Sequence, residues 1–537
     1  MMNVFYLYNS EKKQKLNIDG KNYTPSYILA LMKYMGIDAK ACSLPEISSL
    51  TENDVLVIGA EEIDKIPTNP GAVILLGTMV GKEPETASKE PNIYGYIFTK
   101  EHKLPLFAPV YDDAKDAEVL LWATCDGENK LPALVKRAEN VWDFRFDLAA
   151  SVWYSGDGFS KGKSVFDFFI GRTPDSRPVP ADFDTKEPYS DLLVAELETI
   201  FRKLNVPMFF KMPPKEDGTV PDFMLHISGD DDHSAAVINM NAAKAMNELG
   251  LPYHINAMPD KNGFVFTYEE MKEMNDLGCE FALHSDYIVF PYTLEGQIEQ
   301  AEIFEKCLGY KTITNVNHCL VQGGTAQERM RYLSACGVLA DNGKFAEIDL
   351  NDINAFCLRG FAFGSAFPRF TCDDAEHGNE MLLTAEIPIT FYEPRLVSVE
   401  IEDKIKDYLD HAVRYGEIID FFIHPHYLQP DGPDFPYSTG ALKFAMKYWD
   451  EQGYNPLLST TDKIAIFWHD RANSKVEVSG NIITADCQAD MLLSIANSGE
   501  YVIVDGKKVR VLSKTVNGEV LNLVPLFGAK KHIIEIL

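Results

Sequence analysis

Short apolar runs alternate with amphipathic stretches over about residues 221 to 470. Apolar runs at 223–225 and 253–258 predict strands, while stretches with a helical repeat, 235–249 and 294–308, predict helices. A glycine directly follows each of these helical stretches, as is common where helices end. The pattern continues with a helix at 268–277, a helix at 327–336, and strands at 313–318, 337–341 and 418–424. Units of this length predict a parallel sheet that closes into a (β/α) barrel.

The flanking segments show different patterns. Before residue 145, the runs 54–59 and 72–77 are continuously apolar and end in glycine, which predicts strands buried on both faces of an open, flavodoxin-like α/β sheet. Residues 146–220 contain aromatic and proline-rich pieces and one helix, so we expect a connecting segment that wraps against a neighbour. Residues 471–537 contain short strands with Asp-Gly and Asn-Gly turns, which predict a small β-sandwich.

Segment 1–145 resembles the glutamine-amidotransferase-like domains that accompany many carbohydrate-active enzymes. Cys125 is the only candidate nucleophile among the cysteines of this segment. It lacks the glycine-flanked elbow that such a cysteine needs, and Asp126-Gly127 favours a hairpin turn. We therefore expect an accessory domain without amidotransferase chemistry.

Composition and charge narrow the classes of protein. A length of 537 residues predicts three or more domains, and 46% hydrophobic with 24% charged residues is ordinary for a globular protein. The formal net charge of −30 argues against binding to nucleic acid and to anionic membranes. We find no signal peptide pattern, no apolar run of roughly 20 residues, and nine cysteines at irregular spacing. We therefore expect a cytoplasmic protein with reduced cysteines.

Carboxylates and an imidazole follow predicted strands of the barrel segment. Asp230, Asp231 and Asp232 come just after the run 223–225, and His284 ends another apolar run. In a barrel of alternating strands and helices, both groups would lie at the carboxyl ends of strands, where such folds place their chemistry. Carboxylates and an imidazole that meet there can bind a divalent metal and activate a water molecule.

The barrel segment resembles the polysaccharide deacetylase (NodB-homology) family in three stretches, at residues 228–232, 249–256 and 277–285. The resemblance covers fewer than half of the residues. It implies a distorted seven-stranded (β/α) barrel of the glycoside hydrolase/deacetylase type. It also implies a divalent metal of the zinc type, which serves the hydrolysis of N- or O-acetyl groups on sugars.

The resemblance also implies roles for individual residues. The family's first motif places the base at Asp230 and a metal ligand at Asp231, and a shift by one residue, to Asp231 and Asp232, is an open alternative. The second motif makes His284 a metal ligand. The fifth motif ends in a histidine that donates a proton to the leaving group, and His424 matches it.

The sequence departs from the family pattern at two places. The second metal-binding histidine would fall where the chain has Ile288, and the arginine and prolines of the third motif are missing near 316–318. A metal can take its imidazole from any strand, provided that three ligands converge. His318, at the end of a predicted strand, is therefore our expected substitute ligand, and His424 and His426 are open alternatives.

Other residues are candidates for supporting roles. Asp232 could cap the following helix or join the site, and Asp286 could orient an imidazole or a water molecule. Arg369 lies in a loop rich in glycine and phenylalanine that could hold substrate. His469 is similar to the family's last motif, Leu-His-Asp, but residues 459–462 predict a helix N-cap, so we expect a structural role.

Three hypotheses for the function follow. The leading one is a metal-dependent hydrolase of carbohydrate-type or small acylated substrates, with flanking domains that shape the cleft or a homo-oligomer interface. The second is a glycoside hydrolase, in which Asp230 or Asp232 works with a distant acid such as Glu386. The third is a non-catalytic carbohydrate-binding or scaffolding protein on a degenerate barrel, which Ile288 and the missing arginine would favour.

Overall fold

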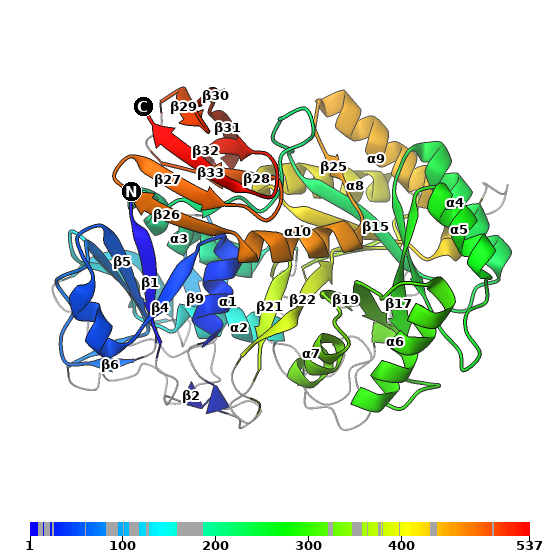
Figure 1. Ribbon diagram of the computed structural model, residues 1–537, viewed down its shortest axis with the longest axis horizontal. Helices are drawn as coiled ribbons and strands as arrows, with labels where there is room; N and C mark the ends of the chain where they lie inside the picture. Colours follow the sequence, from blue (N-terminus) through cyan, green and yellow to red (C-terminus); the bar gives the residue numbers. More distant parts are fainter. Residues whose placement is uncertain are drawn as a thin grey trace.

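The structure is a computed structural model. It describes residues 1–8, 14–15, 22–23, 26–59, 61–81, 95–99, 101–106, 117–124, 128–157, 186–320, 326–345, 357–361, 364–373, 377, 380–396, 398–429, 438–496 and 499–537. In Figure 1 the N-terminal sheet lies on the left and the central sheet with its helices on the right, and α10 (Thr461–Asn473) crosses between them. No helix in these ranges is both long and apolar enough to cross a membrane.

The N-terminal sheet has nine strands of mixed direction. The strands β4, β1, β5, β7 and β13 are parallel, and β12, β11, β9 and β10 continue the sheet in antiparallel fashion. The fully buried β5 (Asp54–Ile58) and β7 (Ala72–Leu76) lie in the parallel part, as their apolar runs predict. The antiparallel half was not predicted, because its longest strands are only partly buried and lack a clear alternation. The remaining strands are β1 (Asn3–Leu7), β4 (Ala39–Cys42), β9 (Gly95–Phe98), β10 (Lys103–Leu106), β11 (Glu118–Thr124), β12 (Leu131–Ala138) and β13 (Val141–Phe144).

Smaller elements complete this half of the chain. Helix α1 (Ser26–Met35) and a 3-10 helix η1 (Leu44–Ser49) connect its first strands, and two short ladders pair β2 (Gln14–Lys15) with β3 (Asn22–Tyr23) and β6 (Glu62–Ile63) with β8 (Met79–Val80). Cys125 and the expected turn after it lie outside the described residues. The described part of segment 146–220 contains α2 (Leu148–Asp157), the expected helix as α3 (Tyr189–Lys203), and the short strand β14 (Met208–Phe209).

A parallel ladder forms the central sheet, in the order β24, β15, β16, β17, β18, β19, β22. Only one residue, Thr390, separates β22 from the next strand, β23, and β23 pairs with β24. One stretch of chain therefore reaches both ends of the ladder, which gives the sheet its half-barrel curvature. The bounds are β15 (Met224–Asp230), β16 (Tyr253–Ala257), β17 (Cys279–Ser285), β18 (Thr314–Asn317), β19 (Ala340–Phe345), β22 (Met381–Ile389), β23 (Phe391–Tyr392) and β24 (Ile418–Phe422), with β20 (Leu358–Arg359), β21 (Arg369–Cys372) and β25 (Leu457–Leu458) at its margins.

Helices follow the strands of the central sheet along the chain. Those expected from the helical repeat at 235–249, 268–277, 294–308 and 327–336 are confirmed within one or two residues as α4, α5, α6 and α7. Gly250 and Gly309 directly follow α4 and α6 with a left-handed backbone, φ 69° and 80°, as the helix-ending glycines predict. The bounds are α4 (Ala236–Leu249), α5 (Tyr268–Asp276), α6 (Leu294–Leu308), α7 (Ala326–Ala335), α8 (Val399–Tyr415) and α9 (Ser438–Gln452).

Two antiparallel sheets make up the C-terminal part, and one hydrophobic core joins them. The five-stranded sheet has the order β26, β27, β33, β29, β30, and the four-stranded sheet has the order β14, β28, β32, β31. The second sheet borrows β14 from far upstream, which sequence reasoning missed because two residues carry no pattern. The bounds are β26 (Lys475–Ser479), β27 (Ile482–Asp486), β28 (Met491–Ser494), β29 (Tyr501–Val504), β30 (Lys507–Arg510), β31 (Leu512–Val516), β32 (Glu519–Leu526) and β33 (Lys531–Ile536).

Arg471, on α10, connects the three parts of the molecule. Its guanidinium is buried and donates to the carbonyl oxygens of Phe209 at 3.1 Å and Phe210 at 2.9 Å, and of Lys33 at 3.0 Å and Tyr34 at 3.1 Å. This one side chain thus donates to backbone carbonyl groups both at the carboxyl end of α1 and at β14. The relative placement of the N-terminal and C-terminal sheets depends on it.

We expect Arg471→Met to lower the free energy of unfolding by at least about 3 kcal/mol, because each buried carbonyl that loses its donor costs roughly 1–3 kcal/mol. Urea unfolding followed by tryptophan fluorescence would measure this loss. Arg510→Met, at an exposed position, is the matched control and should change the midpoint little. Equal midpoints for the two variants would show that Arg471 does not hold the parts together.

Candidate metal centre

Five side chains with acid–base chemistry gather at the carboxyl ends of the central strands. Asp230 is the last residue of β15, and His284 is the residue before the end of β17. His318 directly follows β18, Glu393 directly follows β23, and His424 lies two residues beyond β24. The parallel ladder brings these ends to one edge of the sheet, as the barrel pattern predicts.

The close approach of β15 to β24 requires glycine before the aspartates. A Cβ atom on Gly229 would lie 1.8 Å from the carbonyl oxygen of Ile423, far inside van der Waals contact. The amide of Ile423 also donates to the carbonyl of Ser228, at 2.6 Å. Gly229 therefore allows Asp230 to approach the segment that carries His424.

Asp232 lies between three imidazoles because the chain reverses there. Its φ is +45°, and the following residue, His233, has φ +55°. The Oδ1 atom of Asp232 is 3.2 Å from His284 Nε2 and 3.8 Å from His318 Nε2. Its Oδ2 atom is 3.5 Å from His424 Nε2. Asp232, His284 and His318 offer ligand atoms that all lie within 4.8 Å of one another, which suits a single metal ion.

Each of the two candidate ligand imidazoles, His284 and His318, is oriented by a second partner. The Nδ1 atom of His284 lies 3.1 Å from the carbonyl oxygen of Val316, so this nitrogen carries the proton and Nε2 keeps its lone pair for a metal. The Nδ1 atom of His318 lies 3.3 Å from Asp286 Oδ1. Asp286 thus occupies the place expected for a carboxylate that orients an imidazole. Its position is fixed by the amide of Ile288, which donates to it at 2.9 Å.

Glu393 holds His424 and was not anticipated from the sequence. Its buried Oε1 atom lies 2.5 Å from His424 Nδ1 and accepts the backbone amide of His424 at 3.0 Å. The opposite ring nitrogen, Nε2, faces Asp232. Burial lowers the pKa of His424, but Tyr392, Asp232 and Glu393 together raise it well above the usual value. A histidine in this setting keeps its proton and can donate it from Nε2.

The first two aspartates differ in what they face. Asp230 is buried, accepts the side-chain amide of Asn256 at 2.9 Å, and lies 3.4 Å from His284 Nε2. Burial raises its pKa, against the pull of His284. Asp231 is fully buried and accepts the backbone amide of Met258 at 2.9 Å, and burial raises its pKa to about 7. The geometry therefore brings Asp232, and not Asp231, together with the imidazoles of His284 and His318.

The charges of the cluster fit a divalent cation. Burial lowers the pKa of His284, but Asp230 and Asp232 outweigh it and raise the value. In the same way, the hydrogen bond to Asp286 helps to raise the pKa of His318 to about 10 despite burial. The site therefore favours positive charge between its carboxylates. One carboxylate and two imidazoles form a donor set of the zinc type, which also suits other divalent ions.

Other residues named from the sequence lie away from this cluster. His426 is exposed in the turn after His424, and Arg369 donates to the carbonyl of Val152 at 3.3 Å. Glu386 pairs with Arg329 at 2.6 Å. On the neighbouring strand, Asp341 lies opposite Glu386, and the next residue, Asn342, points inward and accepts the hydroxyl of Ser228. Because successive residues of a strand point to opposite faces, Asp341 and Glu386 point to the other face of the sheet. Ile288 is exposed, and His469 lies on α10, where its ring approaches the carbonyl of Leu339 at 3.0 Å.

A second group, His254, Glu280 and Asp462, lies toward the amino ends of the strands. His254 Nε2 is 3.1 Å from Asp462 Oδ1, and Lys463 is 3.2 Å from Glu280. Thr460 also donates to Glu280. Because a lysine already neutralises one of the carboxylates, this group is a salt-bridge cluster at the start of α10 and a poorer metal site than the first.

Solved structures show distant likenesses. A structure from Mycobacterium smegmatis, described as a polysaccharide deacetylase, is 10% identical with a TM-score of 0.33, and the match spans 50% of this chain and 98% of that one. A family 4 acetyl xylan esterase from Clostridium thermocellum, in complex with a cobalt ion, is 11% identical with a TM-score of 0.26, over 45% and 89% of the chains. A CE4 family pseudoenzyme from Bacillus anthracis is 9% identical with a TM-score of 0.24, over 46% and 67%.

At these values the likenesses assign no activity and no residue role to this chain. The expected resemblance of residues 1–145 to glutamine-amidotransferase-like domains finds no support among them. No protein-family model and no curated protein matches the sequence.

Proposed function

We propose that the chain is a metal-dependent hydrolase of acylated carbohydrates, of the deacetylase type, on a distorted seven-stranded barrel. The observation that carries the proposal is the convergence of Asp232, His284 and His318 beside a buried carboxylate, Asp230, and a carboxylate-held imidazole, His424. Binding of metal, removal of a proton and delivery of a proton are the three functions that hydrolysis of an amide or ester needs.

Asp232, His284 and His318 would hold the metal. A divalent ion bound there supplies Lewis-acid chemistry, because it polarises an acyl oxygen and lowers the pKa of water. This assignment replaces Asp231, favoured by the motif, with Asp232, because an oxygen of Asp232 converges with the imidazoles of His284 and His318, whereas Asp231 Oδ1 accepts the amide of Met258. His318 takes the place that the family gives to position 288.

The remaining residues move protons. Asp230 would accept the proton of the attacking water, and its raised pKa brings it closer to the range useful for a general base. His424 would donate a proton from Nε2 to the leaving amine or alcohol. Glu393 would keep the His424 ring in place and stabilise its charged form.

The two other hypotheses gain less from the geometry. The glycoside hydrolase needs two carboxylates that flank one bond, yet Glu386 is paired with Arg329 on the other face of the sheet. The non-catalytic protein was favoured by Ile288, and His318 supplies the missing imidazole.

Acetate release from N-acetylglucosamine oligomers and from acetylated xylan tests the proposal. We expect release from at least one substrate, loss of it with a chelator, and recovery when zinc, cobalt or manganese is added. Reducing ends are measured in the same samples. New reducing ends without acetate would support the glycoside hydrolase, and binding without either product from metal-loaded protein would support the non-catalytic alternative.

A further inference from the structure

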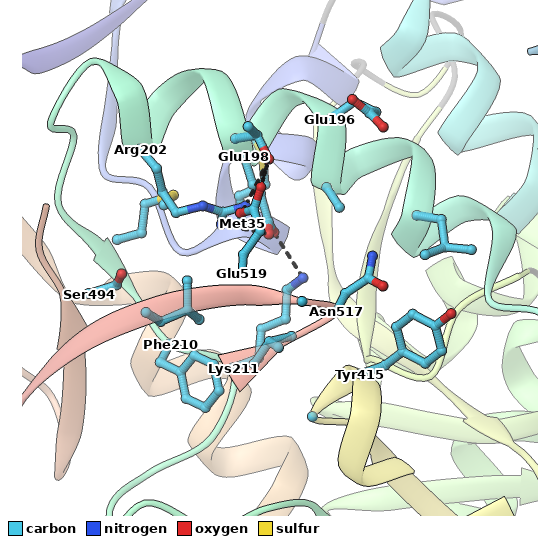
Figure 2. Close-up of a pocket in the computed structure, with 18 of the residues that line it drawn as sticks. Met35, Glu196, Glu198, Arg202, Phe210, Lys211, Tyr415, Ser494, Asn517 and Glu519 are labelled. Carbon is cyan, nitrogen blue, oxygen red and sulfur yellow. Dashed lines mark hydrogen bonds and ion pairs between the residues drawn. The ribbon is translucent and has the colours of Figure 1, made fainter. Parts of the chain in front are cut away.

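A cavity of about 530 Å³, the junction cavity, lies where the N-terminal sheet, α3, the end of α8 and the β31–β32 hairpin meet (Figure 2). None of the residues that line it belongs to the candidate metal centre. Its volume is within the range of roughly 300–1,000 Å³ that is usual for small-molecule sites. It lies at a junction of separate parts of the fold, where small-molecule sites are common.

The charged groups of this junction cavity largely pair with one another. Lys211 Nζ lies 2.9 Å from Glu198 Oε1, and Arg202 lies 3.5 Å from the same carboxylate. Arg202 also pairs with Glu519. These two cations and two carboxylates neutralise each other, as the cluster in the centre of Figure 2 shows. Glu101, at the rim, pairs with Arg414 at 2.8 Å.

One carboxylate of the cavity remains. Glu196 lies on α3, one turn before Thr199, and lines the cavity. It forms no hydrogen bond or ion pair within the described part of the chain. Figure 2 shows its carboxylate apart from the Lys211–Glu198 contact. Burial, and then the charge of Glu519, raise the pKa of Glu196, and the charge of Lys203 offsets them only in part.

The rest of the lining combines hydrogen-bonding groups with apolar surface. Ser494 and Asn517 contribute a hydroxyl and an amide, and Tyr415 and Phe210 contribute rings, whereas the hydroxyl of Thr199 already donates to Glu519 and accepts from Arg202. Hydroxyl and amide groups both donate and accept, which matches a ligand with several hydroxyls. A carboxylate that forms no ion pair within the described part of the chain, such as that of Glu196, matches an ammonium group.

We propose that the junction cavity binds a small polyhydroxylated ligand with one ammonium group, chemically an amino sugar, and that Glu196 receives the ammonium. The binding site follows from the cavity alone. Its significance rests on the proposed function: hydrolysis of an N-acyl sugar yields such an amine, so this cavity would hold product away from the metal centre.

Isothermal titration of the full-length protein tests the proposal, at a pH that keeps the amine protonated. We expect glucosamine to bind about tenfold or more tightly than glucose and N-acetylglucosamine, because only glucosamine forms a charge-assisted hydrogen bond with Glu196. Equal affinity for the three sugars, or binding of none, would overturn the proposal. Ethylamine binding as tightly as glucosamine would overturn the sugar part of it.

Variants locate the site. Glu196→Gln should reduce glucosamine affinity about tenfold and leave the weak affinity for glucose unchanged. Glu500→Gln, at an exposed position elsewhere, is the matched control and should bind like the wild type. Ala195→Trp, which would fill the cavity from α3, should abolish binding without changing the melting temperature by more than a few degrees.

The metal-centre variant Asp232→Asn separates this proposal from the proposed function. It should keep glucosamine binding while metal is lost. If glucosamine binding disappears with Asp232→Asn and persists in Glu196→Gln and Ala195→Trp, the amine binds at the metal centre and the cavity has no such role.

Discussion

Purified wild-type protein should contain about one equivalent of a divalent metal, and His284→Ala should contain almost none. His284 supplies one of the three proposed ligand atoms, and its Nε2 lies 3.2 Å from Asp232 Oδ1 and 3.4 Å from Asp230 Oδ2. Loss of a group that merely supports a ligand typically costs 10–100-fold in metal affinity, so loss of a ligand should cost more than about 100-fold. Metal content by mass spectrometry, followed by zinc titration against a chromophoric chelator, measures the difference.

Variants of two adjacent aspartates, Asp231 and Asp232, test which carboxylate binds the metal. Asp232→Asn should weaken metal binding more than about 100-fold, whereas Asp231→Asn should weaken it less than about tenfold, because Asp231 binds the amide of Met258. The two variants make the same substitution at adjacent positions and are matched controls for each other. The reverse order would restore the assignment that the motif implies. No metal in the wild type, even after incubation with excess zinc, would exclude the proposed mechanism.

Loss of Glu393 should lower kcat without loss of metal. Glu393→Gln and His424→Gln are each expected to reduce kcat by about 10²–10³, since proton transfer by a positioned group contributes that much. Glu393 is a positioning residue, and its removal should also shift the basic limb of the pH profile to lower pH, because the charged form of His424 loses its buried partner. Steady-state kinetics across pH, with metal content measured in parallel, test this.

A second buried pair elsewhere in the barrel provides the control. His411 Nδ1 lies 3.1 Å from the buried Glu417 Oε2, in an arrangement like that of His424 and Glu393. His411→Gln should reduce stability and leave kcat unchanged. If both histidine variants lower kcat equally, the effect is structural, and His424 is not the proton donor.

Much of the central sheet could be predicted from the sequence. β24 is buried on both faces and only Asp420 interrupts its apolar run, so it is visible in the sequence. β16 is buried as well, although His254 and Asn256 alternate with its apolar residues. β22 was missed because Thr384 and Glu386 interrupt its apolar pattern. Both are buried, and their side chains are satisfied by the carbonyl of Val338 and by Arg329, which are distant in sequence. A single sequence does not reveal such partners.

The sequence named most of the residues that the structure brings together, but it missed Glu393, and the roles of all of them stay predictions. His284 and His424 end apolar strands, and the motif pointed to them. That Asp232 and not Asp231 faces the imidazoles depends on left-handed backbone at Asp232, φ +45°. Few non-glycine residues adopt this conformation, and no residue type marks it reliably. Glu393 directly follows β23, so it could have been found only if that strand had been recognised.

The pairing of β14 with β28 affects how the protein is made. Met208 and Phe209 reach their partners Ser494 and Leu493 only after nearly 300 further residues have been synthesised. At about 5–20 residues per second, this takes on the order of tens of seconds on the ribosome. During that time Phe209 lacks the other buried residues of the core of the C-terminal sheets, which begin at Phe467. The nascent chain therefore exposes this apolar segment for much of its synthesis. A chaperone that binds short apolar stretches would bind the nascent chain at this segment.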